Sequence, residues 1–122
     1  MSRNLLTIEP DMGLREAAKR MCDRSVGSAL VVESGRLVGI LTERDVLKAF
    51  AGGVPPSELA KELMTRDPET ISSDDTTEHA TTLMLHGGFR HLPVIDGGEL
   101  VGILSIRDVV DVAAQHSAPR GV

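Results

Sequence analysis

The sequence predicts a mixed α/β (α+β) fold made of two tandem β-α-β-β-α repeats. Residues 37–46 reappear as residues 100–109, identical at eight of ten positions and 63 residues further along the chain. In each copy a helix-like apolar stripe precedes two β-rich runs. Each repeat is near the lower size limit for folding alone, so the 122 residues are expected to form one compact, pseudo-twofold module. We assign residues 1–56 to the first repeat, and residues 57–122 to a linking helix and the second repeat.

Each repeat is expected to open with a short strand, at residues 6–8 and at residues 70–72, followed by an amphipathic helix. Asp11 and Asp74 are the predicted N-caps of the two helices. Apolar or small residues then recur at helical spacing along one stripe. The first stripe is Leu14, Ala17, Ala18, Met21 and Cys22, and the second is Thr77, Ala80, Thr81, Met84 and Leu85. On this pattern Cys22 is predicted to be a buried thiol.

A β-hairpin is predicted after each of these helices. Residues 29–32 and 36–41 flank the turn sequence Glu-Ser-Gly, and residues 92–95 and 99–104 flank Asp-Gly-Gly. The strands are apolar at consecutive positions, so both faces of each small sheet should be covered. A final helix is predicted to start at Thr42 and at Ser105. Residues 51–56 break the chain, residues 57–64 are a predicted short helix, and residues after Gln115 form a polar tail.

The composition argues against several classes of protein. The only aromatic residues are two phenylalanines, and the net charge is −5, so a surface for a nucleic-acid polymer is not expected. A single cysteine cannot form an intramolecular disulfide, which favours a reducing compartment. We find no apolar run of about 18 residues and no signal-type leader. The predicted location is therefore the cytoplasm, without a membrane.

Two matched motifs are the strongest candidates for chemistry. Thr42 and Asp45, like Ser105 and Asp108, stand three residues apart where a helix begins. A carboxylate in this position can accept hydrogen bonds from both hydroxyls of a ribose, and the helix N-terminus suits a phosphate. The same pattern is also an ordinary helix cap. Both roles can coexist.

The repeat resembles the cystathionine-β-synthase-type (CBS) domain pair, also called a Bateman module. The resemblance rests on Gly-Ile-Leu-Thr-Glu-Arg-Asp at residues 39–45 and Gly-Ile-Leu-Ser-Ile-Arg-Asp at residues 102–108. It also rests on residues 25–32 and 88–95, which look like the family's second strand and its entry, and on the lead-in at residues 64–68. Ser105 departs from the more usual Thr, and Ile106 replaces the acidic residue of the first copy.

The resemblance implies a regulatory module that binds an adenine nucleotide, AMP, ADP or ATP, with S-adenosylmethionine as the alternative, in two clefts between the repeats. It also implies disc-like homodimers. Backbone and aliphatic contacts are expected to hold the base, and cations the phosphate. The predicted base-site residues are Thr7, Ile8, Gly27, Ser28, Ala29, Ile71, Leu92 and Pro93. The predicted phosphate cations are Arg44, Arg90, His91 and Arg107. Because Arg90 and His91 replace Gly27 and Ser28, the two clefts should differ in charge.

No required cofactor, metal site or catalytic site is predicted. The histidines lack metal-ligand spacing, and no nucleophile-elbow or Walker pattern accompanies the Ser, His and Asp residues. Three functions remain open: a nucleotide sensor acting on an unknown effector protein, a ligand-free dimerisation adaptor, and, least favoured, a small enzyme. The effector is either another chain or a further part of a longer one.

Overall fold

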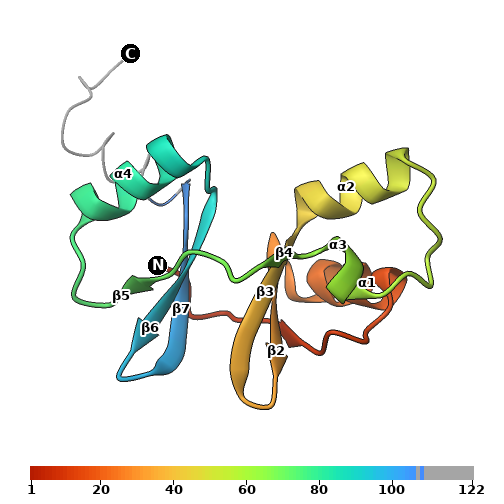
Figure 1. Ribbon diagram of the computed structural model, residues 1–122, viewed down its shortest axis with the longest axis horizontal. Helices are drawn as coiled ribbons and strands as arrows, with labels where there is room; N and C mark the ends of the chain where they lie inside the picture. The colour runs from red at the N-terminus through yellow and green to blue at the C-terminus, as the bar shows by residue number, and fades with distance from the viewer. Residues whose placement is uncertain (107, 109–122) are drawn as a thin grey trace. The chain divides into compact units, whose positions relative to one another are not determined.

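The computed structural model describes residues 1–106 and 108, and it has the mixed α+β architecture of two small sheets with helices (Figure 1). The chain divides into two compact units. One comprises Asn4–Pro68, and the other comprises Met1–Arg3 together with the residues from Glu69 onward. This division differs from the predicted boundary at residue 56, because residues 57–68 make their contacts with the first repeat.

The unit of residues 4–68 contains a four-stranded sheet in the order β1-β2-β3-β4. Strand β1 runs parallel to β2, and β3 is antiparallel to both β2 and β4. The predicted strand, helix and hairpin are confirmed, whereas the predicted helix over residues 57–64 is reduced to four residues. In chain order the elements are β1 (Thr7–Ile8), α1 (Leu14–Arg24), β2 (Ser28–Glu33), β3 (Arg36–Thr42), α2 (Glu43–Ala51), α3 (Ala60–Leu63) and β4 (Thr65–Arg66).

The core of this unit lies between one face of the sheet and the helices α1 and α3. Alternate residues of a strand point to the same face, and Ala29, Val31 and Leu41 of β2 and β3 are buried on this face. Ala17 and Met21 of α1 pack against them, and the whole cluster is Leu6, Ile8, Ala17, Met21, Ala29, Val31, Leu41 and Ala60. The aliphatic sequence thus forms a core without an aromatic side chain in the cluster.

Helix α1 begins later than predicted and without a side-chain cap. Its N-cap is Gly13 and not Asp11. The first amides of the helix are satisfied from a distant segment, since Leu14 N donates to the Glu58 carbonyl at 2.7 Å and Arg15 N to the Pro56 carbonyl at 3.0 Å. A helix start with these partners needs no capping side chain, and Asp11 instead lies 3.5 Å from Lys61 Nζ.

The apolar stripe of α1 is narrower than predicted. Leu14, Ala17 and Met21 are buried, but Cys22 is exposed, so the prediction of a buried thiol is wrong. In α4 (Thr77–Gly87) the equivalent position is Leu85, which is 71% exposed. In both helices the last residue of the predicted stripe, Cys22 or Leu85, is exposed and lies outside the core.

The second unit contains a three-stranded sheet in the order β5-β6-β7. Strand β5 is parallel to β6, and β6 forms an antiparallel hairpin with β7, with the same irregularity near its middle as the first hairpin. The strands are β5 (Ile71–Ser72), β6 (His91–Asp96) and β7 (Glu99–Ser105). Their core cluster with α4 is Ile71, Ala80, Met84, Leu92 and Val94.

The ends of the helices in this unit also differ from the prediction. Helix α4 is capped by Thr76, whose hydroxyl accepts from His79 N at 3.1 Å, so the predicted cap at Asp74 is wrong. Ile106 and Asp108 are helical, which agrees with a final helix starting at Ser105. The rest of that helix and the predicted polar tail lie outside the described residues.

Each sheet ends in a segment that the sequence analysis did not assign to it. Thr65 pairs with Ile40 in the first sheet, and Ser2 forms the matching bridge to Ile103 in the second. The methionine before each pairing residue lies against a strand glycine. A Cβ at Gly39 would lie 2.3 Å from Met64 Sδ, and one at Gly102 would lie 2.5 Å from Met1 Sδ. A larger residue at either position would have to displace the neighbouring methionine side chain, which occupies the space of a methyl group.

Candidate functional site

The Thr42 motif forms a complete capping box where β3 meets α2. The Thr42 hydroxyl accepts a hydrogen bond from Asp45 N at 3.2 Å. In return, Asp45 Oδ2 accepts from Thr42 N at 2.9 Å and from the Thr42 hydroxyl at 3.0 Å. The predicted cap is therefore present, and it holds the carboxylate in a defined orientation.

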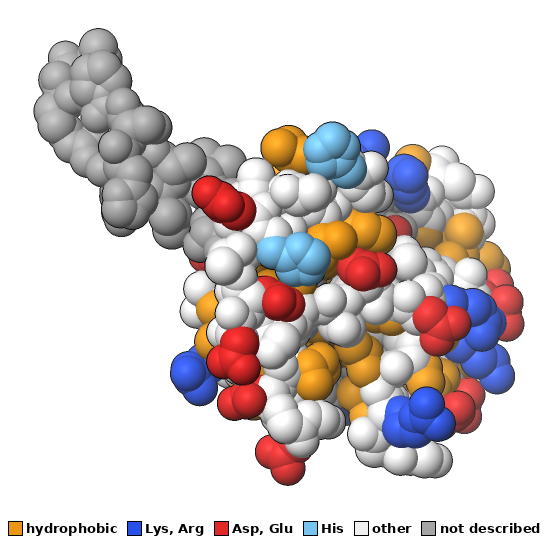
Figure 2. Space-filling view, turned by 60° about the vertical axis from the view of Figure 1, so that its left-hand side comes forward, with side chains coloured by type: hydrophobic (Ala, Val, Ile, Leu, Met, Phe, Trp, Pro, Cys, Tyr) orange, Lys and Arg blue, Asp and Glu red, His pale blue; other side chains and the backbone are white. Residues whose placement is uncertain are grey.

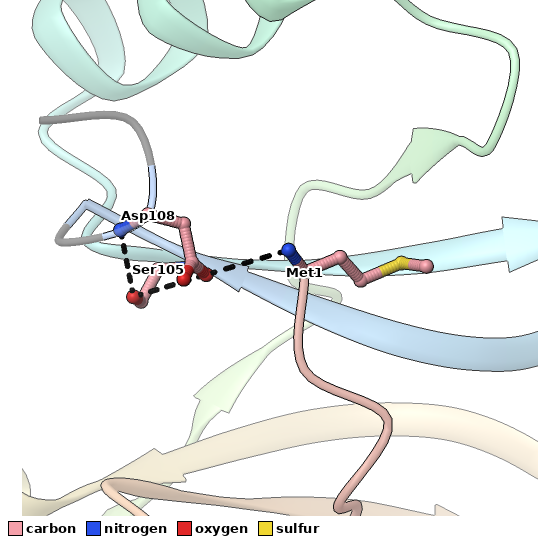
Figure 3. Close-up of polar contacts among 3 residues, drawn as sticks. All are labelled: Met1, Ser105 and Asp108. Atoms are coloured by element: carbon pink, nitrogen blue, oxygen red, sulfur yellow. Dashed lines mark hydrogen bonds and ion pairs between the residues drawn. The ribbon is translucent and has the colours of Figure 1, made fainter. Parts of the chain in front are cut away.

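The Ser105 motif repeats this arrangement in the second unit (Figure 3). Asp108 Oδ2 accepts from Ser105 N at 2.9 Å and from the Ser105 hydroxyl at 3.2 Å, and Asp108 N donates to that hydroxyl at 3.4 Å. A third participant, which was not predicted from the sequence, is the α-ammonium group of Met1, 4.0 Å from Asp108 Oδ2. Met64 lies 63 residues after Met1, the same offset that relates the two repeats. This correspondence is the sequence signal that would have placed Met1 here.

The capping role leaves each carboxylate with capacity for a ligand. Every bond that the two carboxylates accept in these boxes falls on Oδ2, so Oδ1 of Asp45 and of Asp108 can still accept hydrogen bonds. Neither residue is fully buried, and 35% of the Asp108 side chain is exposed. A fixed, partly exposed carboxylate is suited to accept two hydroxyl donors from a neighbouring diol.

The helix N-termini offer less to a phosphate than expected. The first amide of α2, on Glu43, donates to the Gly27 carbonyl at 2.9 Å, and the third, on Asp45, donates to Thr42. In the second unit the amide of Ile106 likewise donates to the Arg90 carbonyl at 2.8 Å. The protein itself satisfies these donors, so they are not available to a phosphate.

The hairpin register brings further predicted residues to each motif. Ser28 lies directly opposite Thr42, and His91 lies directly opposite Ser105. Residues opposite each other in an antiparallel pair point to the same face of the sheet. Ser28 is 6% exposed, His91 is half-buried, and the neighbouring Arg90 is exposed. The structure thus gathers Gly27, Ser28, Thr42 and Asp45 in one repeat, and Arg90, His91, Ser105 and Asp108 in the other.

The remaining predicted residues lie elsewhere or are not described. Four of them, Ile8, Ala29, Ile71 and Leu92, belong to the two hydrophobic clusters. Thr7 is exposed on β1, and Pro93 is fully buried in β6. Arg44 is exposed in the first turn of α2, whereas Arg107 lies outside the described residues.

The surface carries mixed charge. On the face presented in Figure 2, Asp and Glu side chains are widespread, and Lys and Arg side chains stand beside acidic ones. Within residues 1–106 and 108, no group of three or more His, Cys, Asp or Glu side chains is arranged to hold a metal ion. No helix in that same part of the chain is long and apolar enough to cross a bilayer.

Comparison of the sequence with known families gives a clear match. The model of the CBS domain matches residues 1–52 and 60–115. An uncharacterized 17.7 kDa protein of Acidianus ambivalens is 42% identical over 104 residues, which cover 84% of this chain and 63% of that protein. The protein MJ1225 of Methanocaldococcus jannaschii is 30% identical over 90% of this chain and only 40% of its own length. The chain thus spans less than two thirds of either relative.

Solved structures show the same fold. The CBS-domain-containing protein ATU1752 of Agrobacterium tumefaciens superposes with a TM-score of 0.83 at 35% identity, over 91% of this chain and 90% of that one. CBSX2, solved in complex with AMP, gives 0.76 at 28% identity over 95% and 93% of the two chains. The domain pair of MJ0100, solved with 5′-methylthioadenosine and S-adenosylmethionine, gives 0.83 at 27% identity over 93% and 90%.

Proposed function

We propose, since this chain belongs to the CBS-domain family, that it is a regulatory module that binds an adenine nucleotide and acts without catalysis. The ligand is AMP, ADP or ATP, with S-adenosylmethionine as the alternative. The observation that carries the proposal is the duplicated carboxylate at a helix start, held through Oδ2 with Oδ1 available. Related structures solved with AMP and with S-adenosylmethionine support it.

The proposed mechanism depends on hydrogen bonds between each carboxylate and the ribose of the ligand. The diol hydroxyls donate to Asp45 or to Asp108, and each charge-assisted bond contributes about 1.5–3 kcal/mol. A ligand can then signal only if it binds one arrangement of the protein more tightly than another. We place the resulting change at a homodimer contact or at an unidentified effector protein, in the cytoplasm.

Asp45→Asn and Asp45→Ala together test the proposal. Asparagine keeps an oxygen that can accept from Thr42 N but lacks the charge, so it should weaken AMP binding at this site about 10- to 150-fold with little change in melting temperature. Alanine should weaken binding similarly and also lower the melting temperature, because the capping box is lost. Titration calorimetry and thermal unfolding measure the two effects, and Asp108→Asn is the matched variant for the second site.

Unchanged affinity for AMP, ATP and S-adenosylmethionine in both asparagine variants would show that the carboxylates are helix caps only.

One observation favours the competing function of a ligand-free dimerisation adaptor. Leu47 and Phe50, one turn apart on α2, are 67% and 82% exposed. A dimer that forms equally well with and without nucleotide, and that Phe50→Ala disrupts, would support the adaptor.

A further inference from the structure

We infer that the two sites select ligands of different charge, an inference that rests on the proposed function and names the ligand class at each site. The Ser105–Asp108 site takes adenosine bearing a 5′ phosphate. The Thr42–Asp45 site takes adenosine whose 5′ substituent is neutral or cationic, such as a thioether or a sulfonium.

Two of the amides at each helix start are not available to a phosphate. In both repeats the first and third amides of the helix are already engaged, by the carbonyl of residue 27 or 90 and by the capping hydroxyl. The two sites are therefore alike in these two backbone donors. A difference in their preference for a phosphate must come from other groups, which include the side chains around each motif and, at the second site, the α-ammonium group of Met1, 4.0 Å from Asp108 Oδ2.

The residues around the two motifs differ at three positions. The carbonyl acceptor belongs to Gly27 in one repeat and to Arg90 in the other. The residue opposite the capping hydroxyl is Ser28 in one and His91 in the other. The first residue of the helix is Glu43 in one repeat and Ile106 in the other.

These substitutions change the charge of the two sites in opposite directions. Arg90 adds a positive charge and the absence of a counterpart to Glu43 removes a negative one, so the second site is more positive even with His91 neutral. Arg44 does not alter the comparison, because position 107 of the sequence is also arginine. A guanidinium binds phosphate oxygens through paired hydrogen bonds, whereas Glu43 and Asp45 together repel a dianion.

The experiment compares AMP with adenosine at one site at a time. Asp45→Asn weakens the first site, so the second is measured in that background, and Asp108→Asn serves the reverse purpose. In the Asp45→Asn protein, AMP should bind about 10- to 150-fold more tightly than adenosine. Adding Arg90→Gly and His91→Ser should abolish that ratio while adenosine affinity stays within about twofold. In the Asp108→Asn protein, adenosine should bind at least as tightly as AMP, and adding Gly27→Arg with Glu43→Ile should reverse the order.

The outcomes separate the inference from the proposed function. Equal AMP-to-adenosine ratios at the two sites, or a ratio that survives loss of Arg90 and His91, would overturn the inference while leaving adenosine binding intact. A parallel loss of both ligands in the double variant would also overturn it, as would failure of Arg90→Gln, a change at an exposed side chain, to lower the ratio. Absence of binding of either ligand to the unmodified chain would overturn both.

Discussion

The residues of the capping boxes hold in place the carboxylates on which the proposed binding depends. Thr42 and Asp45 exchange three hydrogen bonds, and Ser105 and Asp108 exchange the same three at slightly greater hydroxyl distances. The bonds restrict the carboxylate rotamer before any ligand arrives. Under the proposed function, this restriction reduces the conformational entropy lost on binding, which is how preorganisation raises affinity.

Thr42→Ala should reduce the free energy of unfolding by about 0.5–2 kcal/mol, because the amide of Asp45 loses its acceptor. Thr42→Ser keeps the hydroxyl and reproduces the residue found at position 105, so it should cost much less. Urea denaturation followed by circular dichroism measures both variants. An alanine variant as stable as the serine variant would contradict the capping role.

The sequence predicted the capping motifs at Thr42 and Ser105 but not the caps of α1 and α4. Thr42 and Asp45 are close together in the sequence, and the register of the hairpin places Ser28 opposite Thr42. The first amides of α1 are instead satisfied by Glu58 and Pro56, more than forty residues away. No local pattern around Asp11 contains that information.

At the scale of elements, the hairpins were predictable because turn residues and β-rich runs define them within one segment. The edge partners were not. Strand β4 is only two residues long and exposed, and its pairing with Gly39 and Ile40 depends on how the chain returns after α3. The stripe of α1 was likewise too broad a guide, because Cys22 has helical spacing but no neighbour that buries it.

Gly39→Ala should destabilise the first sheet by about 1–3 kcal/mol, since the new methyl group overlaps Met64 Sδ and Cγ. The cost should be smaller when Met64→Ala removes the obstructing side chain, so the two changes are expected to be non-additive. A double-mutant cycle of unfolding free energies measures this coupling. Simple additivity would show that glycine is needed for a different reason.

At the scale of the whole molecule, the two units are not the two halves of the sequence. The unit of residues 4–68 keeps Ala60 in its core and the carbonyls of Pro56 and Glu58 at the start of α1. A cut at residue 56 removes the fully buried Ala60 and strand β4, and it leaves one edge of β3 unpaired. The repeat in the sequence locates the duplicated core, and the compact unit around its first copy extends to Pro68.

A fragment of residues 4–68 should therefore unfold cooperatively, whereas a fragment of residues 1–56 should be largely unfolded or should self-associate through its bare strand edge. Circular dichroism during heating and analytical ultracentrifugation distinguish the two. Equal stability of the fragments would mean that residues 57–68 add nothing to the first core.

The pairing of β4 with β3 has a mechanical consequence. The connection that leaves the first repeat is hydrogen-bonded to the strand that ends at Thr42, only a few residues before the capping box. A force on this connection would act on β3 through the hydrogen bonds between β3 and β4. Lengthening or shortening the connector is therefore expected to act on β3, the strand that leads into the Thr42–Asp45 capping box.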